Sequence, residues 1–269
     1  MLPDPTSTDV RPHTPPRATA WLAIGSLITV VVLGFGTYQA VGVLAHEERI
    51  ERDTIDANGI GVLDIDSADG SIEVIGTDGD DIVLTARVSD GLQPTRYHHE
   101  VIGDRLEVRV RCPGPSSPWC QVRLRVEVPR ELQVTVHAQN GGVSLRGLDG
   151  RAAASSENGS VDADGLGGPA QLISENGSVR ATGLRSSAVV ARSENGSVSL
   201  THTEAPRTVA ATSENGSVEV AIPSGEEAYV VDIGSGNGST TNGIRTDPAS
   251  DRSITARSEN GTVNVRYLR

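Results

Sequence analysis

Ser156-Glu157-Asn158-Gly159-Ser160-Val161 is the most informative segment of the chain, because the sequence repeats it several times. Identical or nearly identical copies follow at 174–179, 193–198, 213–218 and 258–263, and looser copies begin at Ser67, Ala138 and Ser235. From Gly141 onward, the glycine of this motif recurs at intervals of 18 to 23 residues. Self-similarity at such a period is typical of repeat architectures, in which each unit stacks on its neighbours.

Apolar residues flank the motif glycine at fixed distances. They stand seven and five residues before it and two and four residues after it, as Ala152, Ala154, Val161 and Ala163 do around Gly159. Alternation with period two marks a strand that has one buried face. Each unit is therefore predicted to be a strand, a turn and a second strand, with all four apolar positions on one inner surface.

The Asn-Gly pair at the centre of the motif predicts a tight turn. This pair accepts positive φ at both central positions of a type I′ turn. The predicted turn residues are Asn158, Gly159, Asn176, Gly177, Asn195, Gly196, Asn215, Gly216, Asn260 and Gly261. Two architectures fit: a meander of hairpins, or an all-β solenoid in which Asn-Gly turns the corner of each coil. The solenoid is favoured because stacked coils bring identical residues to about 4.8 Å, where Asn and Ser side chains can form hydrogen-bonded ladders.

The chain before the repeats is predicted to form ordinary strands, at 62–66, 71–75, 82–88, 105–111 and 121–128. The last two alternate cleanly and predict one long hairpin. Its tip is bracketed by Cys112 and Cys120, which are expected to form a disulfide in an oxidising compartment. Two free thiols are the alternative.

A run of 28 residues without a charge, 18–45, predicts a transmembrane helix. Such a helix is about 42 Å long and can cross a hydrocarbon core of about 30 Å. A cleaved signal peptide ending at Ala45 is the alternative, although the apolar part of a signal peptide is usually about 7–15 residues long. The chain is thus predicted to begin with a disordered cytoplasmic tail (1–17), a single transmembrane helix (18–45) and a linker (46–59). An extracytoplasmic β-repeat domain follows (60–269), and its regular Asn-Gly repeats span 132–269.

From about Gly61 onward, the sequence resembles the DUF4097 adhesin family of β-strand-repeat proteins. The resemblance rests on Asp-Gly-Ser-Ile-Glu-Val at 69–74, on Val-Glu-Val-Pro-Arg-Glu-Leu at 126–132 and on the successive Gly-x-Val turns. It implies an extracytoplasmic, often membrane-tethered domain that is β-solenoid-like and has no established enzymatic activity. The chain departs from the family in using Ser-Glu-Asn-Gly-Ser turns throughout, in place of Ser-Gly-Asp turns.

Charge and motifs argue against several classes of function. The net charge of −12 argues against nucleic acid as a partner, because phosphate neutralisation needs clustered basic residues. The sequence has no nucleophile elbow, no phosphate-binding loop and no zinc-ligand spacing. We therefore predict a protein that is not an enzyme and has no catalytic residues and no cofactor.

One acidic position recurs in the repeats, as Glu157, Glu175, Glu194, Glu214 and Glu259. Coils stacked in register place these carboxylates in a column at about 4.8 Å spacing. A divalent cation bridging the column is one interpretation, because it would relieve the repulsion between neighbouring charges. The other is a solvent-facing edge that keeps the solenoid soluble.

Taken together, the sequence predicts a membrane-anchored, surface-exposed binding or adhesion module that meets an unidentified surface or envelope ligand. A structural or envelope-stress-sensing protein without an adhesive ligand is the alternative. The two differ in whether an outer surface of the solenoid recognises a partner.

Overall fold

The computed structural model describes residues 47–90, 95–111 and 121–268, together with five helical residues, Ile24, Ile28, Thr29, Val32 and Leu33. The chain divides into two compact units, Met1–Ala45 and His46–Arg269. Most of the predicted transmembrane helix at 18–45 lies outside the described residues, as do Cys112 and Cys120 of the predicted disulfide. No helix within the described residues has the length and apolar character needed to cross a membrane.

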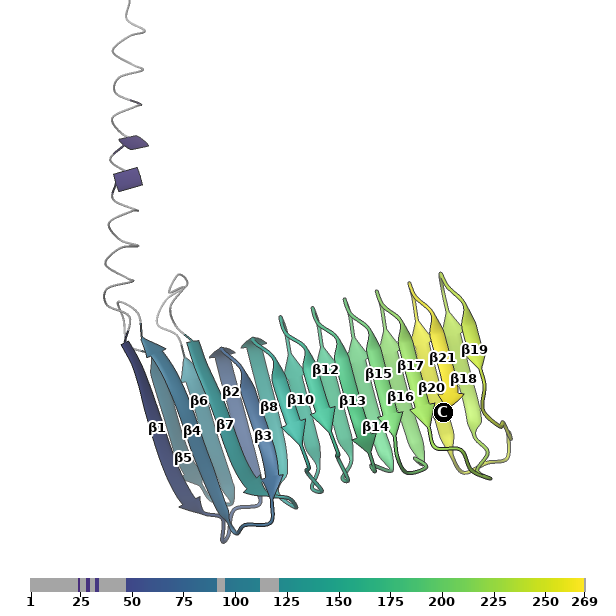
Figure 1. Ribbon diagram of the computed structural model, residues 1–269, viewed down its shortest axis with the longest axis horizontal. Coiled ribbons are helices and arrows are strands. Elements are labelled where there is room, and N and C mark those ends of the chain that lie inside the picture. Colours follow the sequence, from purple (N-terminus) through teal and green to yellow (C-terminus); the bar gives the residue numbers. More distant parts are fainter. Residues whose placement is uncertain are drawn as a thin grey trace, which may run out of the picture. The chain divides into compact units, whose positions relative to one another are not determined.

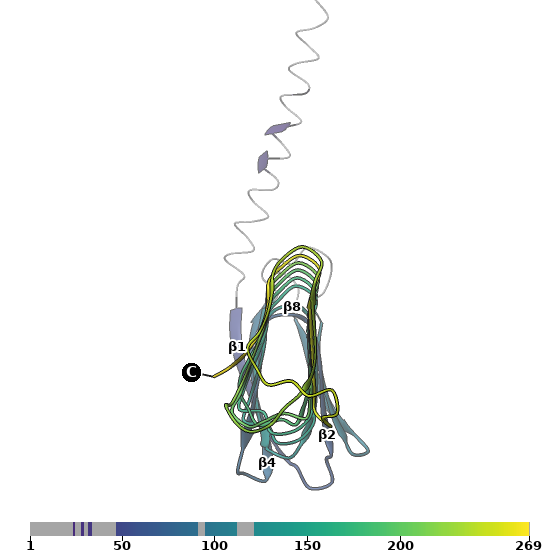
Figure 2. The same ribbon diagram turned by 90° about the vertical axis from the view of Figure 1, so that its right-hand side faces the viewer.

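The described residues of the second unit form two large sheets that face each other (Figures 1 and 2). One sheet contains, in spatial order, β1 (Glu47–Asp56), β4 (Asp81–Asp90), β7 (Gln121–Pro129), β3 (Ile72–Thr77), β9 (Val143–Arg146), β11 (Val161–Asp164), β13 (Val179–Leu184), β15 (Val198–His202), β17 (Val218–Ile222), β21 (Val263–Tyr267) and β19 (Thr240–Asn242). We call it sheet A. Sheet B contains β18 (Val230–Ser235), β20 (Ser253–Ser258), β16 (Thr208–Ser213), β14 (Ala188–Ser193), β12 (Ala170–Ser174), β10 (Ala152–Ser156), β8 (Gln133–Asn140), β2 (Val62–Asp69), β6 (Arg105–Arg111) and β5 (Arg96–Ile102).

Each repeat is one coil of a β-solenoid. Its first strand lies in sheet B, the Asn-Gly turn crosses to the other side, and its second strand lies in sheet A. Neighbouring coils pair in parallel and in register, so that Ala152 lies beside Ala170 and Val161 beside Val179. Since hairpins would pair antiparallel within one sheet, this register confirms the solenoid and excludes the meander.

The core is the narrow space between the two sheets. The four predicted apolar positions of each complete repeat point into it, and Val161, Leu172 and Val179 are fully buried there. Many of these positions are occupied by Ala or Val, which suits thin layers that stack closely. The alternation read from the sequence therefore identified the buried face correctly.

The turn type predicted from Asn-Gly is wrong. No described residue other than glycine has a positive φ, and Gly159 and Gly177 are not among the glycines that do. A type I′ turn serves to join adjacent strands of one sheet, whereas this turn joins strands of opposite sheets. Glycine is needed here for another reason: a Cβ on Gly159 would lie 2.3 Å from the carbonyl oxygen of Gly141 in the preceding coil.

The hairpin predicted for 105–128 is also wrong. β6 lies in sheet B, where Leu106 pairs with Leu63, and β7 lies in sheet A, where Val126 pairs with Val74. Both strands alternate as expected, but alternation only says which face of a strand is buried. It does not say which strand lies alongside, and in a solenoid consecutive strands alternate between sheets.

The predicted linker at 46–59 is a strand over most of its length. β1 pairs antiparallel with β4, from Glu47 beside Asp90 to Asp56 beside Asp81. β1 is dense in charged residues, as is usual for an edge strand that must not pair with other chains. The same composition makes it look like a linker in the sequence.

The last coils are stacked out of chain order. β20 and β21 lie between the β16–β17 coil and the β18–β19 coil, although β18 and β19 come earlier in the chain (Figure 1). The inner positions explain this order. Val263 and Val265 of β21 are fully buried, whereas Thr240 and Asn242 hold the equivalent positions of β19 and are exposed. The coil with polar inner residues therefore closes the end of the solenoid, as capping repeats do.

Candidate functional site

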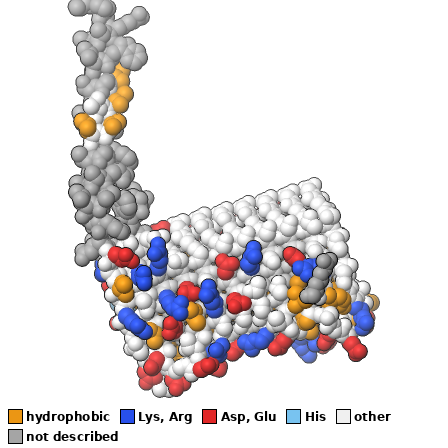
Figure 3. All heavy atoms as spheres, in the orientation of Figure 1, with side chains coloured by type: hydrophobic (Ala, Val, Ile, Leu, Met, Phe, Trp, Pro, Cys, Tyr) orange, Lys and Arg blue, Asp and Glu red, His pale blue; other side chains and the backbone are white. Residues whose placement is uncertain are grey.

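An asparagine ladder runs along the edge formed by the repeated turns. Each Asn side chain donates a hydrogen bond from Nδ2 to Oδ1 of the Asn in the neighbouring coil, at distances of 2.9 to 3.1 Å. The ladder begins at Asp69, which accepts from Asn140, and ends at Asn237. Figure 3 shows this edge as regular white rows without charged side chains on the visible face. The ladder predicted for Asn is thus present, and it explains why Asn is repeated.

A second ladder lies just inside the first. The buried first Ser of each motif donates from Oγ to the carbonyl oxygen of the motif Gly in the neighbouring coil. Ser193 does so to Gly177 and Ser213 to Gly196, both at 2.8 Å. Because the serine side chains are buried, each bond gives a hydroxyl that is removed from water its partner.

Replacing Ser193 by Ala should lower the free energy of unfolding by about 1–3 kcal/mol, because it leaves the Gly177 carbonyl without its donor. Ser199→Ala, on the outward face of the neighbouring strand β15, is the control and should stay within about 0.5 kcal/mol of the parent. Urea unfolding of residues 46–269 measures both. An equal loss in the two variants would contradict a structural role for the inner ladder.

The five repeated glutamates occupy one position in successive coils, as predicted. Their backbone amides stack, since Asn176 N donates to Glu157 O and Asn195 N to Glu175 O. Some of the side chains have individual partners: His137 Nε2 lies 3.7 Å from Glu157 Oε1, and Arg192 Nη2 lies 2.8 Å from Glu214 Oε1. In the described part of the chain, no group of three or more His, Cys, Asp or Glu side chains is placed to hold a metal ion.

A calcium titration of residues 46–269 tests the cation-bridged column. Arg192 contacts both Glu194 and Glu214, so part of the repulsion in the column is already offset within the chain. The carboxylates are also partly exposed and screened by salt. We therefore expect the melting temperature to be unchanged by calcium. A rise that saturates with calcium would favour the cation column.

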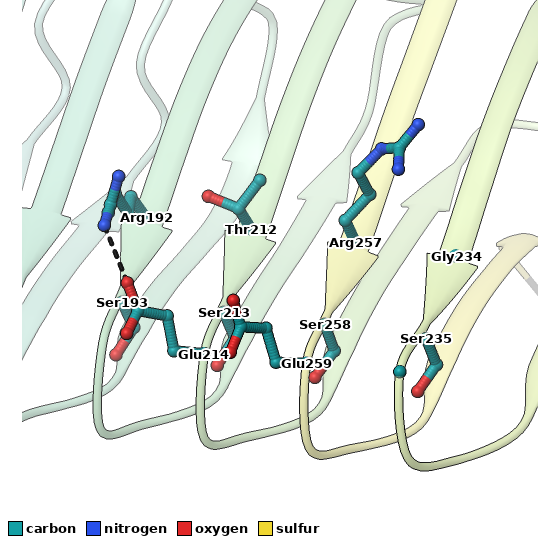
Figure 4. A pocket seen from close by; sticks show the side chains of 11 residues that line it. Arg192, Ser193, Thr212, Ser213, Glu214, Gly234, Ser235, Arg257, Ser258 and Glu259 are labelled. Carbon is teal, nitrogen blue, oxygen red and sulfur yellow. Dashed lines mark hydrogen bonds and ion pairs between the residues drawn. The ribbon is translucent and has the colours of Figure 1, made fainter.

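The glutamate column borders a hollow of about 500 Å³ on the outer face of sheet B (Figure 4). Arg192, Thr212 and Arg257 stand side by side on β14, β16 and β20 and form its centre. Gly234 of β18 follows in the same row and leaves one side open because it has no side chain. The two arginines are two strands apart, roughly 10 Å, with the short Thr212 between them.

The hollow presents hydrogen-bond donors and acceptors together. Glu214 and Glu259 extend back towards the preceding coil, and Figure 4 shows the ion pair between Glu214 and Arg192. Arg257 Nη2 bonds Asp232 Oδ2 at 2.6 Å. Both guanidinium groups keep further N–H donors and are about half exposed. The arrangement can therefore bind a polar ligand that offers acceptors to the arginines and donors to the carboxylates.

The serines of the hollow are not arranged for nucleophilic chemistry. Ser193, Ser213, Ser235 and Ser258 all belong to the inner ladder, and each hydroxyl donates to a glycine carbonyl. No histidine or cysteine is among the side chains that line the hollow. A hydroxyl that donates to a backbone carbonyl has no base to accept its proton, so these groups support binding better than catalysis.

The turn residues and the glutamates are predictable from the sequence, whereas the hollow is not. Its centre comes from the position just before the motif serine, which is Arg192, Thr212 or Arg257 in these coils and Ser155 or Ile173 in others. That position does not repeat, so it gives no periodic signal. Moreover, Thr212 and Arg257 lie side by side only because β20 is stacked out of chain order.

By strand pairing and burial, the second unit is a β-solenoid with a polar outer surface, in which the repeat coils pair in parallel and β1, β4 and β5 pair antiparallel. No family model matches the chain, and no curated protein matches it. Solved structures that are similar to it include a candidate cell adhesion protein from Clostridium sporogenes, at 12% identity over 82% of this chain and 100% of that chain with a TM-score of 0.45. A candidate adhesin from Bacteroides fragilis has 14% identity over 82% and 97% of the two chains, with a TM-score of 0.43. A candidate lipid binding protein from Parabacteroides distasonis has 11% identity over 83% and 97%, with a TM-score of 0.36.

Proposed function

We propose that the chain is a non-catalytic binding module of the adhesion type, anchored in a membrane by residues 18–45. In this proposal the tail 1–17 is cytoplasmic and the solenoid lies outside the cytoplasm. The observation that carries the proposal is the hollow on sheet B, where Arg192 and Arg257 flank Thr212 and two glutamates stand beside them.

The chemistry of the hollow favours a hydroxyl-rich ligand that also carries acidic groups. The guanidinium groups offer paired N–H donors that suit carboxylate or sulfate oxygens. The Glu214 and Glu259 carboxylates accept only, and so suit hydroxyl donors. An acidic oligosaccharide has both features. The ligand would bind through hydrogen bonds and ion pairs, since no aromatic side chain lines the hollow.

Stacking supports the proposal because it makes the surface rigid. Each strand of the hollow is bonded to its neighbours along the sheet, and the serine and asparagine ladders hold the adjacent turns. A backbone held in this way loses little conformational entropy when a ligand binds.

Binding of residues 46–269 to immobilised acidic oligosaccharides tests the proposal. The double variant Arg192→Gln/Arg257→Gln should weaken binding at least about tenfold, since it removes two charge-assisted contacts. The matched control is Arg109→Gln/Arg125→Gln, two salt-bridged arginines that are about half exposed, one on the outer face of each sheet, and it should bind like the parent. An equal loss in both variants would indicate attraction by charge alone.

The structural or stress-sensing alternative makes a different prediction for the same experiment. If neither double variant changes the retention of the protein on any acidic or neutral oligosaccharide surface, the hollow is not a binding site. A chain whose solenoid is only a spacer should also tolerate the hollow variants in cells without loss of attachment.

A further inference from the structure

The inserted coil β20–β21 is held on both sides by the same ladder contacts. On one side Ser258 Oγ donates to Gly216 O at 2.8 Å and Asn260 Nδ2 donates to Asn215 Oδ1 at 3.0 Å. On the other side Ser235 Oγ donates to Gly261 O at 2.7 Å, and Asn237 continues the asparagine ladder. The β20–β21 coil therefore occupies the space between the β16–β17 coil and the β18–β19 coil, which we call the slot. Both neighbouring coils contact it through its Ser-x-Asn-Gly motif.

The connection that leads into this slot is unusual among the repeats. Ten residues, 243–252, link β19 to β20, because the chain must pass back over the β18–β19 coil. Between β11 and β12 only 165–169 are needed, and between β13 and β14 only 185–187. Those short loops reach no further than the adjacent coil. Residues 223–229 between β17 and β18 also pass over one coil position, and 243–252 is the longest of the connections between the repeat strands described here.

This connection is held by hydrogen bonds more than by apolar packing, and the side chains of Arg245 and Arg252 also donate to backbone carbonyls of neighbouring loops. Its backbone bonds to Tyr229, where Tyr229 N donates to Arg245 O and Asp247 N donates to Tyr229 O. Ser250 Oγ donates to Ala228 O. Apart from Ile244, its residues are exposed or only partly buried. Opening the connection would therefore sacrifice little buried apolar surface, provided that the coil finds an equivalent slot.

We infer that β20–β21 can be exchanged between two copies of this chain. In the exchanged dimer, Ser253–Tyr267 of one copy fills the slot between β16–β17 and β18–β19 of the other. The ladder bonds and the buried packing of Ile254, Ala256, Val263 and Val265 are the same in both states. Only the connection 243–252 differs, so protein concentration decides the balance.

A second copy is the occupant that the slot selects. A coil that fills the slot needs Ser, Asn and Gly at the ladder positions and apolar residues at the four inner positions. A coil with a different sequence would leave carbonyl groups such as Gly216 O without a donor. Residues 253–267 of a second copy meet every requirement in the observed register.

Exchange also changes how the hollow on sheet B is built. The β20–β21 coil supplies Arg257 and Glu259, whereas the β14–β15 and β16–β17 coils supply Arg192, Thr212 and Glu214. In the exchanged dimer each hollow is therefore completed by the partner copy, and the two hollows belong to one assembly. This inference does not depend on the nature of the ligand.

A designed disulfide distinguishes exchange from other modes of association. Ala210 and Thr255 are neighbours across β16 and β20, both directed outwards, at a parallel spacing of about 5 Å that a disulfide can bridge. We introduce Ala210→Cys/Thr255→Cys into the full chain carrying Cys112→Ser/Cys120→Ser. The bond closes within one chain in the monomer and joins two chains in the exchanged dimer. The matched control is Val190→Cys/Ala210→Cys across β14 and β16, a pair that exchange never separates.

The expected result is a covalent dimer on non-reducing gels for the 210/255 pair, in a fraction that rises with expression level, while the 190/210 pair stays monomeric. Monomers alone at every expression level would overturn the inference, and so would dimers for both pairs. If the cysteine variants fail to accumulate, unmodified chains with two different tags replace them. Co-purification of the tags after synthesis in the same cells, but not after mixing of separate extracts, supports exchange; no co-purification, or equal co-purification in both samples, overturns it.

Discussion

Replacing Gly177 by Ala is expected to lower the free energy of unfolding by about 3 kcal/mol or more, which is the largest effect we predict for a single methyl group. A Cβ at this position would lie 2.5 Å from Gly159 O, 2.6 Å from Gly159 C and 2.8 Å from Ser160 N. All three atoms belong to the backbone of the preceding coil, so no side chain can rotate away. The coil must move, and the ladders on both sides resist that movement.

Gly142→Ala is the matched control, because it adds the same methyl group to a turn glycine that has room. The nearest atom to a Cβ there is Ser160 O at 3.5 Å, an ordinary contact, and its φ is not positive. We expect it to stay within about 0.5 kcal/mol of the parent. Urea unfolding of residues 46–269 with unchanged m-values measures both variants. A tolerated Gly177→Ala would mean that the coils can separate without cost, contrary to the observed stacking.

Acidification is expected to destabilise the solenoid through His202. This side chain is fully buried, and neither ring nitrogen has a hydrogen-bond partner in the described part of the chain. It continues a buried row formed by Leu148, Leu166 and Leu184 in preceding coils. Burial in these apolar surroundings lowers the pKa of His202 from 6.5 to about 4. The folded protein therefore keeps the imidazole neutral where the unfolded chain would protonate it.

The direction of the pH dependence follows from proton binding. Between pH 6.5 and pH 4 the unfolded chain binds more protons at this residue than the folded chain. The contribution of His202 to stability is therefore complete above pH 6.5 and is lost as the pH falls towards 4. A shift of this size corresponds to about 3 kcal/mol. The free energies of unfolding of the parent and of His202→Leu are measured at pH 7 and pH 4. Protonation of the carboxylates affects both proteins alike, so the additional loss of stability in the parent is the contribution of His202.

His202→Leu should also be more stable than the parent at pH 7, because it removes two buried polar atoms that have no partner and restores the residue found in the preceding coils. His98→Gln, at an exposed position of β5, is the control and should leave the pH dependence as it is. Parallel pH curves for the parent and His202→Leu would show that His202 does not titrate on unfolding in this range.

The candidate site was only partly predictable from the sequence. The glutamate column and the asparagine ladder were, because a residue that repeats in register must stack if the coils do. The hollow was not, because Arg192, Thr212 and Arg257 come from three coils with different residues at that position. His202 gave no signal either: its burial follows only from the stacking of β15 on β13.

The repeat, the buried face of nearly every strand and the residues of the ladders can be read from the sequence alone, because period-two alternation and the identity of repeated residues are local properties. The sequence did not determine the partners of β6 and β7, the strand at Glu47–Asp56 or the position of β20–β21. Those features depend on which coil can bury its inner residues against which neighbour. That choice is decided by packing between segments that are far apart in the sequence. Thr240 and Asn242 place their coil at the end of the stack, while Val263 and Val265 place theirs inside it, and that choice brings Arg257 beside Thr212 and creates the hollow.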